Sequence, residues 1–203
     1  MLNYNWDPVW QNKKGYAAYK LRVKKAKQKL DWFAIKGSVK KSGLIIDVGC
    51  GAGYVAKELH ARTGCVVIGF DISLHAIKSA KVLCSDKEAK FHVAPAAKLP
   101  LKQKSVDIVF YIGCLEHIEE FDKAIREAYR VLKPNGQICI VSSNYYSFVH
   151  FFAYKLRQKL GLWRYGYEYD WKPEELIEQL TVWSLFSSRR WGRYIVLTGN
   201  RIK

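Results

Sequence analysis

The sequence predicts an α/β domain with a doubly wound, mostly parallel sheet and helices on both of its faces. Between residues 44 and 142, short apolar runs alternate with amphipathic helical patterns, the order expected of parallel strands connected by helices. Two more strand-like runs follow at residues 182–188 and 193–200, and we expect them to pair as an antiparallel hairpin across residues 189–192. The 203 residues are enough for one such domain.

The formal net charge of +16 is concentrated at the two ends of the chain. By direct count residues 1–42 carry about +9 and residues 150–203 about +5, so the centre is close to neutral. Basic flanks favour an acidic partner, such as RNA, a phosphorylated metabolite or an anionic membrane surface. The basic flanks are explained equally well as a solvated surface that only confers solubility. No apolar run has the length of a membrane span.

Residues 1–42 are expected to form a basic helical cap. Tyr4, Trp6 and Trp10 predict an aromatic arm that packs over a cleft or against the core. Residues 13–33 place apolar side chains at every third or fourth position among lysines, which indicates a basic amphipathic helix. The first ten residues have no signal-peptide pattern, and the five cysteines form no C-x-x-C pair. The sequence therefore predicts a reduced, cytoplasmic protein, peripheral to a membrane if the cap binds lipid.

A glycine-rich turn follows the first predicted strand. Asp47 closes that strand, and glycines stand at positions 49, 51 and 53 before a helix that begins at Tyr54. A side chain on this turn would hold a ligand away from the backbone, and the first amides of the helix favour a carboxylate or phosphate. The dinucleotide fingerprint G-x-G-x-x-G does not fit, because Tyr54 stands where its last glycine would be.

The segment from Asp47 to Gly53 has the pattern D-x-G-x-G-x-G, which resembles motif I of the class I S-adenosylmethionine-dependent methyltransferases. The resemblance implies a Rossmann-like fold with a seven-stranded sheet that ends in the antiparallel hairpin. It also implies S-adenosylmethionine as the cofactor and S-adenosylhomocysteine as the product. The methionine part of the cofactor would lie over the glycine loop.

Asp71 ends the second predicted strand, residues 66–70, about twenty residues after the glycine loop. A carboxylate at this place can accept hydrogen bonds from two neighbouring ribose hydroxyls, and this is the role we expect. The alternative is an N-cap of the helix that starts near Leu74, for which Ser73 competes.

Residues 94–101 resemble only in part the family segment G-D-A-x-x-L-P-F. Pro95 stands where many members have an aspartate near the adenine amino group, so we expect the backbone of Ala96 and Ala97 to bind the adenine edge. Losing such a charged hydrogen bond would weaken cofactor binding by about 1.5–3 kcal/mol. A methyltransferase fold that binds without catalysing therefore stays an alternative.

The stretch after the fourth predicted strand, residues 105–112, resembles small-molecule members of the family. There an L-E-H turn leads into a helix, which we expect to end at Pro134 and Gly136, before a fifth strand at residues 137–142.

Glu116 and His117 belong to this turn, at the carboxyl end of a strand where the cleft floor is expected. His117 can act as a general base or orient a substrate, and Glu116 can assist, whereas local hydrogen bonds that shape the loop are equally compatible. Quinone-pathway relatives that use a divalent metal have a further glutamate where Gly113 stands, so we expect no metal site.

The last quarter of the chain is expected to complete the acceptor side. Residues 143–172 are rich in aromatic and basic side chains and predict a substrate lid, with Tyr146 and Tyr167 as candidate acceptor contacts. Residues 173–203 predict a closing helix that starts at Pro173, followed by the hairpin.

The sequence thus predicts a single-domain methyltransferase, monomeric or homodimeric, with residues 43–142 as its cofactor-binding core. We expect it to methylate an O, N or C atom of a small-molecule or lipid-like acceptor, an anionic acceptor being one option, with RNA, in particular tRNA, as the alternative. The residues expected to bind the cofactor are Asp47, Gly49, Cys50, Gly51, Gly53, Asp71, Ile72, Ala96, Ala97, Ile112 and Leu115.

Overall fold

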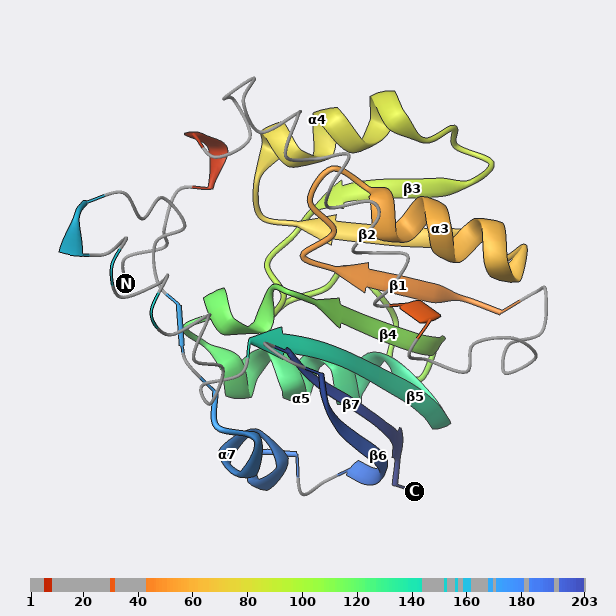
Figure 1. The fold of residues 1–203 in the computed structure, drawn as a ribbon. Coiled ribbons are helices and arrows are strands. Elements are labelled where there is room, and N and C mark those ends of the chain that lie inside the picture. Colours follow the sequence, from red (N-terminus) through yellow and green to blue (C-terminus); the bar gives the residue numbers. More distant parts are fainter. Residues whose placement is uncertain are drawn as a thin grey trace.

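A seven-stranded sheet of order β3-β2-β1-β4-β5-β7-β6 forms the centre of the computed structural model (Figure 1). Neighbouring strands from β3 to β5 are parallel, and β7 is antiparallel to both β5 and β6, which confirms the predicted fold class. The strands are β1 (Ile45–Val48), β2 (Val67–Asp71), β3 (Ala89–Val93), β4 (Val106–Ile112), β5 (Leu132–Ser143), β6 (Trp183–Trp191) and β7 (Tyr194–Arg201).

The structure describes most of the chain from the first strand onward, and two short pieces before it. For residues 183–191 it describes the backbone only. The described residues are 6–8, 30–31, 43–143, 152, 156, 159–161, 168–169, 171–180, 183–191 and 194–202.

Helices cover both faces of the sheet, because successive side chains of each strand point to opposite sides. On β1, Ile45 belongs to the apolar cluster that contains α3 (Tyr54–Thr63) and α4 (Leu74–Leu83). Ile46 belongs to the cluster that contains α5 (Phe121–Val131) and α7 (Pro173–Glu178). Both isoleucines are fully buried, so the short apolar run at the start of the glycine motif lies in the middle of the core.

The strand order reverses at β1, which pairs with β2 on one side and with β4 on the other. In parallel sheets the loops on either side of such a point lead away from each other and leave a crevice at the carboxyl ends of the strands. The glycine loop after β1, the turn after β2 and the 3₁₀ turn η1 (Leu115–His117) after β4 all lie at this end. The topology therefore brings the predicted motifs to one edge of the sheet.

The end of α5 differs from the sequence prediction. This helix stops at Val131, and β5 begins at Leu132 rather than after Pro134. Proline has no N–H to donate, and its ring disfavours helical backbone in the residue before it, so the chain is already extended ahead of Pro134. The buried face of α5 follows the predicted period, with Phe121, Ala124, Ile125, Ala128 and Val131 buried.

The predicted connection of the C-terminal hairpin is wrong. Residues 189–191 belong to β6, which runs to Trp191, and β7 begins at Tyr194. Trp191 pairs with Tyr194, so only two residues separate the strands. Two-residue connections are the commonest hairpin loops, because their twist matches that of the strands.

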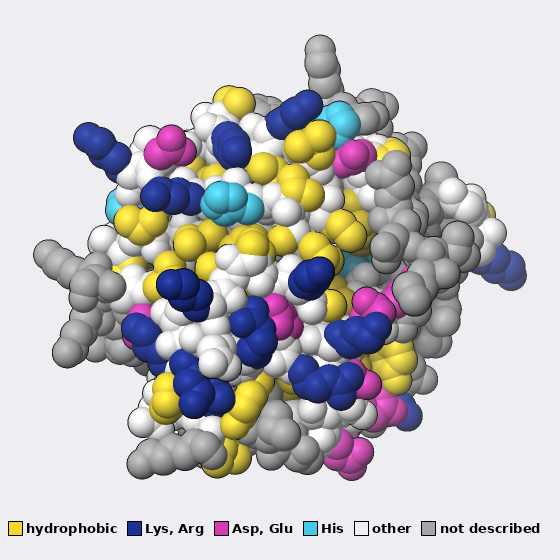
Figure 2. All heavy atoms as spheres, turned by 180° about the vertical axis from the view of Figure 1, so that it is seen from behind, with side chains coloured by type: hydrophobic (Ala, Val, Ile, Leu, Met, Phe, Trp, Pro, Cys, Tyr) yellow, Lys and Arg dark blue, Asp and Glu magenta, His cyan; other side chains and the backbone are white. Residues whose placement is uncertain are grey.

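Lys and Arg side chains gather on the lower half of the face in Figure 2, the half to which α5, β5 and α7 belong in Figure 1. All five cysteines are free thiols. Among the helices that the structure describes, none is long and apolar enough to cross a membrane.

Candidate functional site

The glycine loop turns sharply at three left-handed residues, Gly49 (φ 71°), Gly51 (φ 53°) and Gly53 (φ 84°). Its start is fixed to β2, because the amides of Gly49 and Cys50 both donate to the carbonyl of Phe70, at 2.7 and 3.0 Å. Only glycine adopts this conformation without strain. The left-handed backbone of this loop is therefore one reason for its glycines, and the approach of a ligand is another.

Two of these glycines also leave room for neighbouring side chains of the chain itself. A Cβ on Gly49 would lie 2.5 Å from the Cβ of Cys114, and one on Gly53 would lie 2.8 Å from the ring of Phe91. Close approach of a ligand is one reason for the absence of side chains in this loop. Packing against β3 and the turn after β4 is a second reason.

Asp71 is held at the end of β2 by two backbone amides. Its Oδ2 accepts from Gly51 N–H at 2.8 Å and its Oδ1 from Ser73 N–H at 2.9 Å. Burial raises the pKa of Asp71, and these two hydrogen bonds oppose the rise. Each carboxylate oxygen keeps a further lone pair, so a vicinal diol can still donate to both.

Ser73, and not Asp71, is the N-cap of α4. Its hydroxyl accepts from Ala76 N–H at 3.2 Å, which is the usual N-cap contact. Asp71 is thus not needed as a helix cap, and its carboxylate lines a pocket instead.

Asp47 lies behind the glycine loop and is only 1% exposed. Its Oδ2 has no hydrogen-bond partner, and it is one of the few buried polar atoms of the described residues without one. Burial, followed by the charge of Asp71, raises the pKa of Asp47 to about 8, against the opposing hydrogen bond from the Ala56 backbone. A cation over the loop would favour the ionised carboxylate, so this orphaned oxygen suits a ligand that carries an ammonium group.

A pocket of about 200 Å³ opens at the point where the strand order reverses, and we call it the switch-point pocket. Ile72 lies on its wall and is 44% exposed, an unusual state for an isoleucine beside a carboxylate and one that suits a ligand lying against it. The wall consists of Trp6, Val48, Gly49, Asp71, Ile72, Ala94, Pro95, Ala96, Ala97, Gly113, Cys114, His117, Ile118, Glu119 and Glu120.

Several residues expected at the site lie behind this wall rather than on it. Leu115 is fully buried in the core, and Glu116 is 6% exposed. The wall includes six of the expected residues, namely Gly49, Asp71, Ile72, Ala96, Ala97 and His117, whereas Asp47, Cys50, Gly51, Gly53, Ile112, Leu115 and Glu116 are not part of it. Tyr146 and Tyr167 lie outside the described residues.

Glu116 and His117 have different surroundings although they are adjacent. The Glu116 carboxylate accepts from the Ser142 hydroxyl at 3.0 Å, and its carbonyl accepts from Tyr169 N–H at 2.7 Å. His117 is on the pocket wall, where its ring packs edge to face against Trp6 with 4.9 Å between the ring centroids. This placement favours the structural interpretation of Glu116 and leaves His117 facing the pocket.

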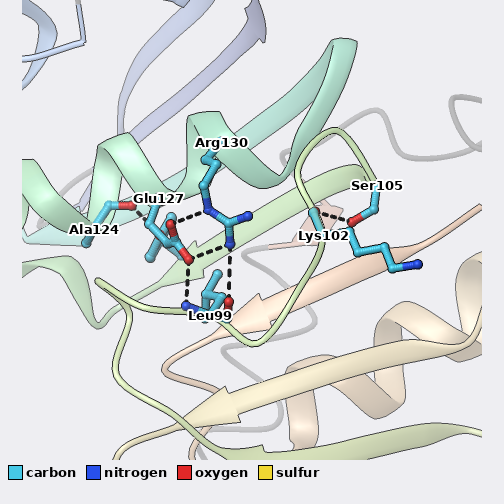
Figure 3. A network of polar contacts seen from close by, with 7 residues as sticks. Leu99, Lys102, Ser105, Ala124, Glu127 and Arg130 are labelled. Atoms are coloured by element: carbon cyan, nitrogen blue, oxygen red, sulfur yellow. Dashed lines mark hydrogen bonds and ion pairs between the residues drawn. The ribbon is translucent and has the colours of Figure 1, made fainter.

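The loop that carries Pro95, Ala96 and Ala97 is attached to α5 by a polar network that the sequence analysis missed (Figure 3). Glu127 accepts from Leu99 N–H at 2.7 Å, and Arg130 donates to the Leu99 carbonyl at 3.2 Å. Arg130 also holds Glu127 at 2.7 and 2.8 Å. Both side chains come from the polar side of α5, so their spacing alone indicated only an ion pair within the helix.

A family model described as a methyltransferase domain matches residues 46–140, which include the whole wall of the switch-point pocket except Trp6. This match identifies a methyltransferase domain in the centre of the chain, at the residues that carry the predicted class I motifs. The chain is therefore a methyltransferase.

Relatives of this methyltransferase differ in what they are named for. A ubiquinone biosynthesis O-methyltransferase of Pelagibacter ubique is 29% identical over 85% of this chain and 75% of its own length. A tRNA (carboxymethyluridine(34)-5-O)-methyltransferase of Arabidopsis thaliana is 38% identical, but over 51% of this chain and 24% of its own length. The methyltransferase solved in complex with the Haloferax volcanii Trm112 activator has the same fold, with a TM-score of 0.82 at 16% identity and 100% coverage of both chains.

The residues of the switch-point pocket fit S-adenosylmethionine. Asp71 offers two acceptor oxygens for a ribose, and Gly49 is exposed at the start of the glycine loop. The orphaned oxygen of Asp47 lies beneath that loop, where the ammonium of the methionine part would supply an opposite charge. Among the described residues, no group of three His, Cys, Asp or Glu side chains is arranged to hold a metal ion.

Proposed function

We propose that this methyltransferase binds S-adenosylmethionine in the switch-point pocket and methylates a small-molecule or lipid-like acceptor. The observation that carries the proposal is the Asp71 carboxylate, which faces the pocket while the amides of Gly51 and Ser73 hold it in place. A carboxylate fixed in this way is preorganised for a diol, since it does not have to be reoriented on binding.

The remaining cofactor contacts follow from the pocket wall. The backbone of Gly49 supports the methionine part, with Asp47 acting from below through the loop rather than by direct contact. Ile72 covers one side of the nucleoside, and the backbone of Ala96 and Ala97 binds the adenine edge. The network on Leu99 keeps that last segment in position although Pro95 offers no side-chain acceptor.

The bound cofactor supplies a methyl group on a good leaving group, so the protein has to position the acceptor and exclude water. Val48, Cys114 and Ile118 give the pocket an apolar side where water is poorly held. His117 lies on the wall at the end of the turn after β4. We assign it one of two roles, accepting the proton of the acceptor or orienting the acceptor. Glu116 acts as a positioning residue for this turn through Ser142 and Tyr169.

Our choice of acceptor class is based on how much of this chain each relative aligns with. The ubiquinone biosynthesis relative aligns along most of this chain, whereas the tRNA-modifying relative aligns over half of it. We therefore favour a small-molecule or lipid-like acceptor, with residues 143–172 as its lid. The charge of about +9 on residues 1–42 favours RNA as the second candidate.

Calorimetric titration with S-adenosylmethionine and S-adenosylhomocysteine tests the cofactor site. We expect micromolar binding by the native chain and a loss of about ten- to a hundred-fold in Asp71→Ala, because charged hydrogen bonds to the ribose are removed. Asp86→Ala is the matched control, since Asp86 is exposed and distant from the pocket wall.

No binding by the folded native chain would overturn the proposal and favour the non-catalytic alternative. If the cofactor binds, release of S-adenosylhomocysteine is followed with quinol-like phenols and with tRNA as acceptors. Turnover with tRNA alone would overturn the small-molecule assignment and leave the cofactor site intact.

A further inference from the structure

Trp6 lies on the wall of the switch-point pocket although it comes from outside the matched methyltransferase domain. Its ring packs against His117 at 4.9 Å with an angle of 68° between the ring planes. Figure 1 shows residues 6–8, in red, near the start of α4 and at the end of the sheet where β1 to β5 finish. The N-terminal segment thus reaches the site that the core residues form.

Asp7 fixes this segment to the N-terminus of α4. Its Oδ1 accepts from the Ser73 hydroxyl at 2.5 Å and from His75 N–H at 3.3 Å, and lies 3.2 Å from the His75 ring nitrogen. A negative charge at this end of a helix is favoured by the helix dipole and by the free amides of the first turn. The contact therefore favours an acid at position 7.

Ser73 connects this attachment to the cofactor site. Its backbone N–H donates to Asp71, its hydroxyl donates to Asp7, and the same hydroxyl accepts from Ala76 N–H. The carboxylate expected to bind the ribose and the carboxylate that anchors the N-terminal segment therefore share one serine.

We propose that Trp6 and Asp7, which we call the N-terminal clasp, complete the cofactor site: Trp6 contacts the bound nucleoside or sulfonium, and Asp7 is its positioning residue. The inference rests on the proposed function, because it assumes that S-adenosylmethionine occupies the switch-point pocket. An electron-rich indole facing a site for a sulfonium is a physically suitable wall, since aromatic faces attract cations.

Intrinsic fluorescence of the full chain tests the contact directly, with S-adenosylhomocysteine as the probe. We expect the probe to change tryptophan emission in the native chain and Trp6→Phe to lose most of that change. Trp171→Phe is the matched control, because Trp171 is buried against Phe121 and is not part of the pocket wall. It should retain the response.

Calorimetry then measures what the clasp contributes to binding. We expect Trp6→Ala to raise the Kd for S-adenosylmethionine roughly three- to thirty-fold, the range of a desolvated cation–π contact, and Asp7→Ala to have a similar effect. The double variant should be no weaker than Trp6→Ala alone, because Asp7 acts through Trp6 and the two changes are not additive. A purely structural role of Asp7 would instead lower the melting temperature and add to the loss.

The outcomes separate the clasp from the cofactor site beneath it. Native binding that Asp71→Ala weakens and Trp6→Ala leaves unchanged would overturn the clasp and keep the proposed function. Additive losses in the double variant would overturn the role of Asp7 as the positioning residue. Absence of binding in the native chain would overturn both.

Discussion

At the scale of single residues, the two aspartates of the motifs have separate roles. Asp71 faces the pocket with both oxygens held by amides, whereas Asp47 is buried behind the loop with an orphaned oxygen. The difference arises from burial, because a carboxylate with few donors in an apolar setting is costly to ionise. Only Asp71 can meet a ligand directly.

The raised pKa of Asp47 makes the stability of the chain depend on pH. The folded chain keeps this proton up to about pH 8, while the unfolded chain releases it near the ordinary aspartate pKa of 3.8. Native stability therefore falls as the pH rises from about 4 to about 8 and is constant above, as far as this group contributes. We expect Asp47→Asn to be more stable than the native chain by roughly 1–4 kcal/mol at pH 8 and by less at pH 5.

Urea unfolding at both pH values measures this difference, with Asp86→Asn as the exposed control. An advantage of Asp47→Asn that is equal at pH 5 and pH 8 would contradict the assigned protonation.

At the scale of elements, the loop after β3 depends on α5 for its position. Pro95 and the two alanines after it have no side chain that could fix them, so the Glu127–Arg130 pair does so through Leu99. The hydrogen bond from Arg130 lowers the pKa of Glu127, so the pair stays ionised at neutral pH. Because Glu127 is partly buried, this ion pair contributes more to stability than an exposed pair would.

Removing the Glu127 carboxylate is expected to loosen the adenine side of the pocket. We expect Glu127→Ala to cost about 1–2 kcal/mol of unfolding free energy and to weaken S-adenosylhomocysteine binding several-fold, because Leu99 N–H loses its acceptor. Calorimetry and thermal unfolding measure the two effects. Glu58→Ala is the matched control, since Glu58 pairs with Arg62 within α3 and away from the pocket wall; a loss of affinity there as large as in Glu127→Ala would refute the assignment.

At the scale of the whole molecule, the chain has 34 Lys and Arg against 18 Asp and Glu, and the excess lies mostly outside the cofactor core. Charge of this kind acts over distance and is screened by salt, whereas the hydrogen bonds of the pocket are local. The two kinds of interaction can therefore be separated experimentally.

If the flanks bind RNA, we expect affinity for a tRNA pool to fall at least ten-fold between 50 and 200 mM NaCl, because several phosphates release counterions. Fluorescence anisotropy with labelled tRNA measures this, and S-adenosylhomocysteine binding, which should change little, is the internal control. Absence of tRNA binding at 50 mM NaCl together with binding to anionic vesicles would contradict the RNA alternative and favour a lipid surface.

The sequence by itself determined the features that depend on local chemistry. Alternating apolar runs set the order of strands and helices, and the glycines, Asp71 and the L-E-H turn identified the family, since these patterns lie within a few residues of each other. The end of α5 and the hairpin loop were misplaced, because strand pairing and Pro134 decided them rather than periodicity.

Only the tertiary structure decided which residues meet. It placed Leu115 and Glu116 behind the pocket wall, assigned the cap of α4 to Ser73, and brought Leu99 to Glu127 and Arg130. It also placed Trp6 against His117 and Asp7 against Ser73. These contacts join residues that are 66 or more positions apart in the sequence. Such contacts depend on the sheet topology, which a pattern of neighbouring residues does not record.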